Sequence, residues 1–116
     1  MKRDYRVYLD DIIGAIEKIE KYINGLTFDE FSRDEKTIDS VIRNFEIIGE
    51  AAKNVPEEIR QEYPKIPWKE MAGMRDKLIH EYFGVKIEVV WETIKKRLPN
   101  VKALSKKALE EMGKEI

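Results

Sequence analysis

Apolar residues recur every three or four positions along most of this chain, and this spacing limits the fold more than any other feature. Between Arg3 and Ile23, and again between Asp34 and Asn54, the repeat places apolar side chains on one face of an α-helix. Gly49 lies inside the second of these faces, where it costs helix stability but lets a neighbouring helix approach closely. No stretch of any strength alternates in the manner of a half-buried strand. The sequence therefore predicts an all-α, antiparallel bundle of four to five main helices, formed as a single domain over residues 1–116.

Capping and turn residues divide this pattern into segments. Asn24 and Gly25 end the first helix, and Thr27 and Glu30 have the spacing of a capping box that opens a short turn of helix. Pro56 is predicted at the first position of another short helix. Three further prolines predict an extended connection before the next helix and a break in the last one: Pro64, Pro67 and Pro99.

The composition excludes several kinds of chemistry. The chain has no cysteine and one histidine, so disulfides, thiolate zinc sites and a cysteine nucleophile are excluded, and we expect no metal site and no cofactor. Its 22 basic and 23 acidic residues nearly cancel, so any contact with nucleic acid has to be local. The sequence shows neither a signal peptide nor a membrane span, which predicts a soluble cytoplasmic protein.

The stretch from Trp68 to Val85, WKEMAGMRDKLIHEYFGV, contains a charge in an unexpected place. As a helix it gathers six residues on one apolar face, with Arg75 in their midst: Trp68, Met71, Ala72, Leu78, Ile79 and Tyr82. Arginine does not lose its charge in a dry environment, so Arg75 needs a carboxylate, a partner chain or a bound phosphate. Glu46 and Glu50, one turn apart on the preceding long helix, are candidate carboxylates.

The single histidine follows Arg75 by five residues. Five helical residues give a rise of about 7.5 Å and a rotation of about 140°, so Arg75 and His80 can hardly hold one small group within a straight helix. They could do so across a helix end or across a dimer axis. His80 falls in the last turn before Gly84, where the helix dipole favours the imidazolium, and Asp76 precedes it by one turn.

Each of these residues also has a purely structural interpretation. His80 near a helix end is compatible with a capping or surface role. Arg75 is compatible with a buried ion pair to Glu46 or Glu50, and Tyr82 with a core aromatic whose hydroxyl reaches the rim. The residues alone leave these alternatives open.

The segment from Arg75 to Tyr82 resembles the R-x4-H-x-Y signature of the HepT toxins, a branch of the HEPN superfamily. The stretch Arg43–Lys53 is similar to the second-helix pattern of that family, and Trp68–Met74 to the segment that leads into its motif. The likeness covers nearly the whole chain. It implies a helical bundle that forms a homodimer, in which the two motif helices face each other and line one cleft.

The resemblance also implies an activity. A HepT toxin is a metal-independent endoribonuclease, in which the ribose 2′-hydroxyl attacks the adjacent phosphate. His80 would transfer the proton, Arg75 would stabilise the charge that builds on the phosphate, and Asp76 would hold the geometry. The implied partner is a MntA-like nucleotidyltransferase antitoxin that transfers AMP to the motif tyrosine, here Tyr82.

Two other functions remain open. A non-catalytic HEPN module would use Arg75 and His80 to bind nucleotide or the transferase partner. A helical bundle without such a site would use Arg75 only as a structural ion pair.

Overall fold

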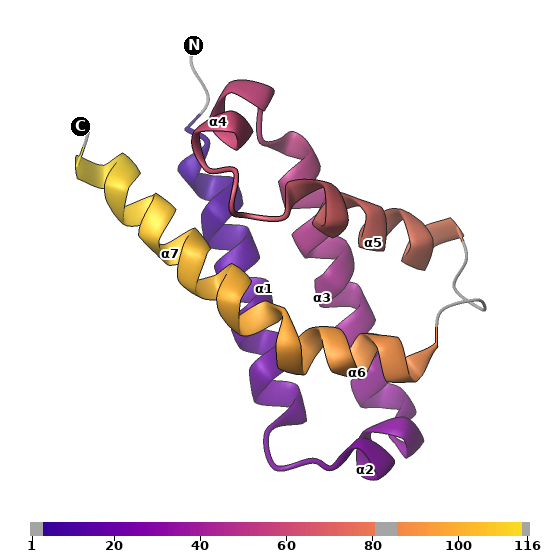
Figure 1. Cartoon of the computed structure of the whole chain (residues 1–116). Coiled ribbons are helices and arrows are strands. Elements are labelled where there is room, and N and C mark those ends of the chain that lie inside the picture. Colours follow the sequence, from indigo (N-terminus) through magenta and orange to yellow (C-terminus); the bar gives the residue numbers. More distant parts are fainter. Residues whose placement is uncertain (1–3, 81–85, 115–116) are drawn as a thin grey trace.

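The computed structural model describes residues 4–80 and 86–114, and it gives side chains for residues 4–78 and 86–113. Within these ranges the chain forms seven helices and no strand (Figure 1), so the predicted all-α class is confirmed. The helices are α1 (Arg6–Ile23), α2 (Phe28–Arg33), α3 (Glu35–Asn54), α4 (Glu57–Glu62), α5 (Trp68–His80), α6 (Ile87–Lys96) and α7 (Leu98–Lys114). Those of ten or more residues are α1, α3, α5, α6 and α7, in agreement with the four to five main helices expected.

Helices α1 and α3 run antiparallel and form the centre of the molecule (Figure 1). Their facing sides are apolar and supply most of the core, including Leu9, Ile12, Ile16, Ile19, Val41, Phe45 and Ile48. The connection between them contains the predicted capping box, in which Thr27 and Glu30 each accept a hydrogen bond from the other's backbone N–H. Gly25 ends the first helix with a φ of 81°, a backbone conformation that favours glycine.

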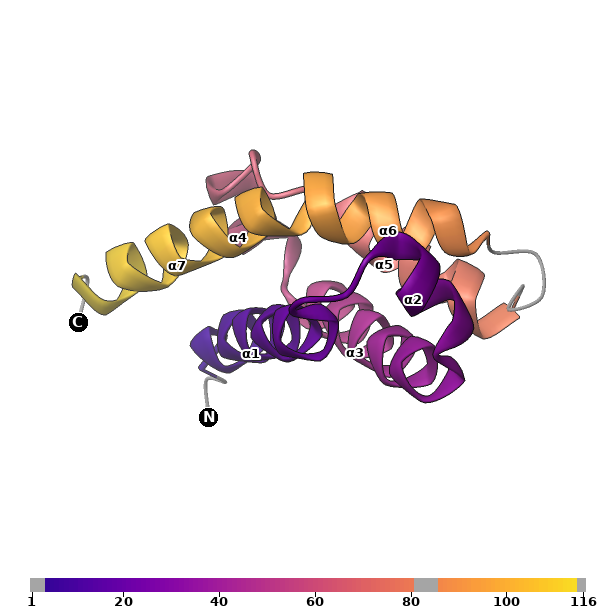
Figure 2. The ribbon, with the colours of Figure 1, turned by 90° about the horizontal axis from the view of Figure 1, so that it is seen from below.

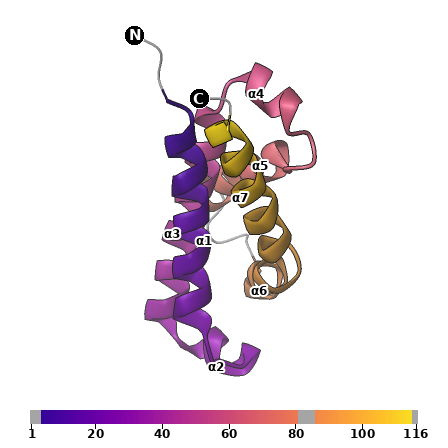
Figure 3. The same ribbon diagram turned by 90° about the vertical axis from the view of Figure 1, so that its left-hand side faces the viewer.

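Helices α6 and α7 form a second layer over one face of the α1–α3 pair, as Figures 2 and 3 show from two directions. α6 and α7 follow one another in nearly the same direction, and α5 lies across α3 beside them (Figure 1). Val90, Ile94, Leu98, Val101 and Ala108 from these two helices are buried in the same core.

Two helix boundaries differ from the sequence predictions. Pro56 is the N-cap of α4 rather than its first helical residue, because its ψ of 156° is extended. The break before α7 falls at Arg97, two residues ahead of Pro99. Pro99 itself lies in the first turn of α7, where its missing N–H costs no helical hydrogen bond.

Within the described ranges, no helix has both the length and the apolarity that crossing a membrane requires.

Candidate functional site

The described part of the stretch with the misplaced arginine forms α5, which crosses α3 at Gly49. A Cβ atom at position 49 would overlap the Cβ of Arg75 and lie 2.9 Å from the carbonyl oxygen of Met71. The two helices can approach this closely only because residue 49 has no side chain. The prediction that Gly49 lets a neighbouring helix come near is therefore confirmed, and the neighbour is the helix that contains Arg75.

The apolar face predicted for α5 is present in the described part of that helix. Trp68, Met71 and Leu78 are buried, and Ala72 is partly exposed. Arg75 lies on the same face, with 25% of its side chain exposed. The arginine is thus neither fully buried nor freely solvated, and carboxylates from two helices compensate its charge.

Arg75 belongs to a small network of charges, here called the Arg75 cluster: Glu50, Lys53, Arg75 and Asp76. One guanidinium nitrogen lies 3.0 Å from Oε2 of Glu50, and another donates a 3.1 Å hydrogen bond to Oδ1 of Asp76. The ammonium of Lys53 donates a 2.6 Å hydrogen bond to the same Asp76 oxygen. Two cations and two carboxylates therefore share one surface where α3 and α5 cross.

The protonation of Asp76 reflects this position. The hydrogen bond from Lys53, followed by the one from Arg75, lowers the pKa of Asp76 below its ordinary value of 3.8. Asp76 is consequently a carboxylate at neutral pH, and it acts only as an acceptor of hydrogen bonds. In this form it can hold both cations in place.

An open groove borders the Arg75 cluster on the side of α1. Its volume is about 370 Å³, and it is lined by Tyr8, Asp11, Arg43, Glu46, Ile47, Glu50, Ala51, Asn54 and Arg75. The partly exposed Arg75 side chain is therefore accessible to a molecule in this groove. The size falls within the usual range of about 300–1,000 Å³ for small-molecule sites. On the other flank of α5, a shallower hollow of about 860 Å³ reaches Asp76.

The predicted site residues have different outcomes. Arg75, Asp76 and Glu50 lie together, so the ion pair between Arg75 and a glutamate of α3 is found, with Glu50 as the partner. Glu46 lines the same groove but pairs with Arg43 at 3.6 Å.

The side chains of the remaining two predicted residues lie outside the described part of the chain. The backbone of His80 forms the end of α5, but its side chain lies outside the described part of the chain. Tyr82 lies outside the described residues altogether. The roles of both residues stay predictions.

Lys53 is the member of the cluster that the sequence predictions missed. Lys53 follows Glu50 by three positions, so both side chains project toward α5 from the same face of α3. That spacing was visible in the sequence. What the sequence did not indicate is the crossing at Gly49, which brings Asp76 within reach.

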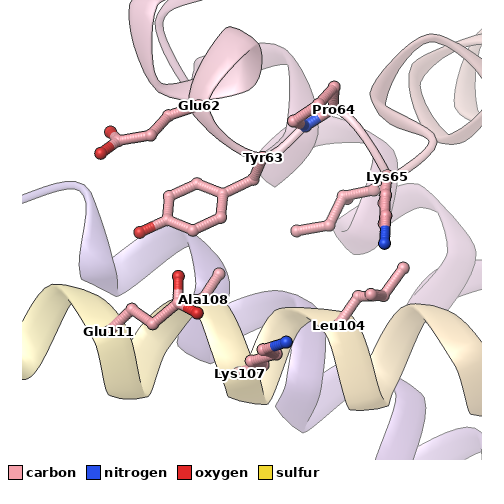
Figure 4. A pocket seen from close by; sticks show the side chains of 9 residues that line it. Glu62, Tyr63, Pro64, Lys65, Leu104, Lys107, Ala108 and Glu111 are labelled. Atoms are coloured by element: carbon pink, nitrogen blue, oxygen red, sulfur yellow. The ribbon is translucent and has the colours of Figure 1, made fainter.

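A further pocket is lined by none of the residues of the Arg75 cluster. It has a volume of about 210 Å³ and sits between the connection from α4 to α5 and helix α7. Figure 4 shows Tyr63 and Lys65 on one side and Leu104, Lys107 and Glu111 on the other. The pocket is smaller than typical ligand sites and contains none of the predicted site residues, so we assign it no function.

No group of three or more His, Cys, Asp or Glu side chains in the described ranges is arranged to hold a metal ion. The Arg75 cluster offers a different chemistry. A partly exposed arginine beside an open groove defines a helical protein with a candidate site for an anion, and phosphate is an anion whose geometry the guanidinium matches well.

Comparisons with known proteins identify the family of this helical protein. The family model described as "Ribonuclease HepT-like" matches residues 12–108. A protein of Thermococcus cleftensis named "Probable ribonuclease HepT" is 52% identical over 102 residues, which span 88% of this chain and 93% of that protein. A Methanocaldococcus jannaschii protein named "Putative RNase" is 46% identical over 115 residues, 99% of this chain and 92% of its own length. No solved structure gives a significant match. The chain belongs to the HepT-like ribonuclease family.

Proposed function

We propose that this protein is the toxin of a toxin–antitoxin pair and acts as a metal-independent endoribonuclease. The family and the ribonuclease names of its relatives support RNA as the substrate. The observation that carries the proposal is the position of Arg75. Its guanidinium borders an open groove and is held in place by Glu50 and Asp76, as a group that receives a phosphate must be.

The proposed reaction is an internal transfer at one phosphate of the RNA. His80 removes the proton from the ribose 2′-hydroxyl, and the 2′-oxygen forms a bond to the adjacent phosphorus. The bond from phosphorus to the 5′-oxygen breaks, that oxygen takes up a proton, and a 2′,3′-cyclic phosphate remains. Arg75 stabilises the negative charge that builds on the phosphate oxygens, and Asp76 keeps Arg75 in position.

The proposed active form is a homodimer. Residues five positions apart in a straight α-helix are about 140° apart around its axis, so one ideal helix would not direct Arg75 and His80 at the same small group. Two α5 helices that face each other across a two-fold axis place Arg75 and His80 of both copies along one cleft. The groove beside Arg75 lies on the surface of the single chain, which leaves it accessible to such a partner or to RNA.

The test of the activity is cleavage of single-stranded RNA by the purified protein in EDTA. The wild type is expected to cut, and His80→Ala is expected to lose about a hundredfold or more of the rate, as removal of a general base typically does. Light scattering should give the same mass for both proteins. Equal cleavage by wild type and His80→Ala would contradict the role of His80 in proton transfer.

The proposed control of the toxin is a covalent modification of Tyr82 by a MntA-like nucleotidyltransferase antitoxin. The tyrosine oxygen would attack the α-phosphate of ATP, form the AMP ester and release pyrophosphate. A bulky anion at this position would compete with RNA for Arg75. Coexpression with the antitoxin should add the mass of one or more AMP groups to the wild type and none to Tyr82→Phe.

One observation favours a second candidate, a non-catalytic module that binds nucleotide or the transferase partner. Both carboxylates next to Arg75 already compensate its charge, and the whole chain has a net charge of −1. This candidate predicts a folded protein that never cleaves RNA, and an Arg75 variant that loses partner or nucleotide binding instead.

A further inference from the structure

Lys53 lies outside the motif from Arg75 to Tyr82, and it is the one member of the Arg75 cluster that has no role in the reaction described above. It projects from the last turn of α3, and its ammonium lies 2.6 Å from Oδ1 of Asp76. The same oxygen accepts the hydrogen bond from Arg75 at 3.1 Å. Lys53 and Arg75 therefore compete for one carboxylate oxygen, and a change in Lys53 alters what Asp76 does to Arg75.

Charge balance shows why this competition matters. Glu50 and Asp76 both contact Arg75, so these three residues alone carry a net charge of −1. A phosphodiester also carries −1 and would be repelled by such a group. Lys53 brings the cluster to neutrality through its contact with Asp76. With Lys53 in place, the charge of Asp76 is divided between Lys53 and Arg75, and an incoming phosphate meets a neutral cluster instead of a negative one.

The end of α3 is built to keep Lys53 in this position. The guanidinium of Arg60 donates hydrogen bonds of 2.9 Å and 3.1 Å to the carbonyl oxygens of Ala52 and Lys53, and another of 2.9 Å to that of Val55. Ala52 and Lys53 are in the last turn of α3, where a carbonyl oxygen has no N–H four residues ahead within the helix, and the carbonyl of Ala52 also accepts the N–H of Val55. The last turn of α3 is thereby fixed against α4, whose last turn contains Arg60, and Lys53 is held where it reaches Asp76.

We infer that Lys53 is a positioning residue for RNA cleavage, which holds Asp76 and thereby leaves the Arg75 guanidinium available to the phosphate of the substrate. This inference rests on the proposed ribonuclease function. Without Lys53, the whole charge of Asp76 acts on Arg75, and the phosphate competes for the guanidinium with a more strongly bound carboxylate. The main consequence is weaker substrate binding, seen in KM more than in kcat.

A purely structural role for Lys53 makes a different prediction. The side chains of Lys53 and Asp76 are 39% and 45% exposed, and exposed ion pairs contribute little to stability. If stability were the only role, Lys53→Met would change the unfolding midpoint slightly and leave cleavage as it was. The kinetic constants therefore separate the two roles.

The experiment compares four proteins on one fluorescent RNA substrate at low salt: the wild type, Lys53→Met, Lys53→Arg and Lys36→Met. Lys53→Met removes the charge and keeps the length of the side chain. Lys53→Arg restores a cation that can reach Asp76. Lys36→Met is the matched control, because Lys36 is an exposed lysine in the first turn of the same helix, about 25 Å along α3 from Lys53.

The expected result is a rise in KM of about tenfold for Lys53→Met, the effect of one unit charge a few ångströms from a phosphate near a protein surface. Lys53→Arg should recover most of this loss, and Lys36→Met should match the wild type. The loss should shrink as salt is raised, since screening weakens the contribution of the charge.

Three results overturn the inference while leaving the proposed function intact. They are wild-type kinetics for Lys53→Met, an equal loss for Lys36→Met, and no recovery in Lys53→Arg. A wild type that neither cleaves RNA nor binds a 2′-deoxy, non-cleavable version of the substrate overturns the proposed function itself, and the inference fails with it.

Discussion

Helix α3 makes two contacts of opposite character. Toward α1 it presents a row of buried apolar side chains, among them Val41, Phe45 and Ile48. Toward the middle of α5 it presents Gly49 and the charged side chains of Glu50 and Lys53. The first contact buries apolar area and stabilises the fold. The second places four partly exposed charges around one crossing point.

The apolar side of α3 therefore stabilises the fold, and the side that faces α5 forms the candidate site. The members of the Arg75 cluster are between 25% and 56% exposed, so their ion pairs add little to the free energy of unfolding. Charges that contribute little to stability, but are held in fixed positions, fit a binding or catalytic role. The predictions below test whether substitutions in the two contacts have different consequences.

The largest effect on stability is expected from Ile16→Ala in the contact between α1 and α3. Ile16 is 0% exposed, and truncation of a buried isoleucine costs about 2–5 kcal/mol of the free energy of unfolding. Urea unfolding followed by circular dichroism measures this loss. Val7→Ala is the control, because Val7 is on the same helix and 48% exposed, and a change within about 0.5 kcal/mol is expected there. Equal losses would mean that this contact is not the core.

Gly49→Ala tests the crossing of α3 and α5. The new Cβ would overlap the side chain of Arg75, and overpacking of this kind costs about 1–3 kcal/mol. RNA cleavage should fall as well, since Arg75 has to move. Gly14→Ala in α1 is the matched control: a Cβ there meets nothing within 4 Å, and alanine should stabilise that helix by about 0.5–1 kcal/mol. The same sign for both variants would contradict the close approach at Gly49.

Glu50→Gln removes one counter-charge from Arg75 and keeps the shape of the side chain. Because Glu50 is 56% exposed, the free energy of unfolding should change by less than about 1 kcal/mol. Cleavage should respond more, with a lower KM for RNA, since one of the carboxylates that compete with the phosphate is neutral. A loss of stability as large as that of Ile16→Ala would instead assign Glu50 to the core.

The smallest expected effect is on pH dependence. The pKa of Asp76 lies below its ordinary value of 3.8, so the folded state binds this proton less tightly than the unfolded state. Its contribution to stability is therefore complete above pH 3.8 and is lost as the pH falls through the lowered pKa. A carbon-13 NMR titration of Asp76 should give a midpoint below 3.8, and Lys53→Met should raise that midpoint. An unchanged midpoint in Lys53→Met would contradict the contact between Lys53 and Asp76.

The sequence predicted the features that depend on local spacing. The apolar repeats located α1 and α3, the capping box at Thr27 was identified from two residues, and Gly49 was interpreted as a point of close helix approach. Each of these follows from neighbouring residues, since capping and helical faces are set within one or two turns. The boundaries near Pro56 and Arg97 differ from the predictions, because proline fits several positions at a helix start.

The Arg75 cluster was only partly predictable because it depends on where two helices cross. The carboxylate on α3 was expected to be Glu46 or Glu50, and only the crossing at Gly49 selects Glu50. Lys53 was missed for the same reason: its partner Asp76 is 23 positions away in the sequence. The resemblance to a family supplied the roles of His80 and Tyr82, and these roles stay predictions.

The most direct test of the central claim measures stability and RNA cleavage on the same sample of Arg75→Met. Methionine keeps the aliphatic packing of the side chain against Gly49 and removes the guanidinium with its charge and its hydrogen bonds. We predict a change of less than about 1 kcal/mol in the free energy of unfolding, because Glu50 is solvated and Asp76 keeps Lys53, together with a loss of cleavage of about a hundredfold or more. Wild-type cleavage by a protein that has lost much of its stability would show that Arg75 is a structural ion pair and would contradict the claim.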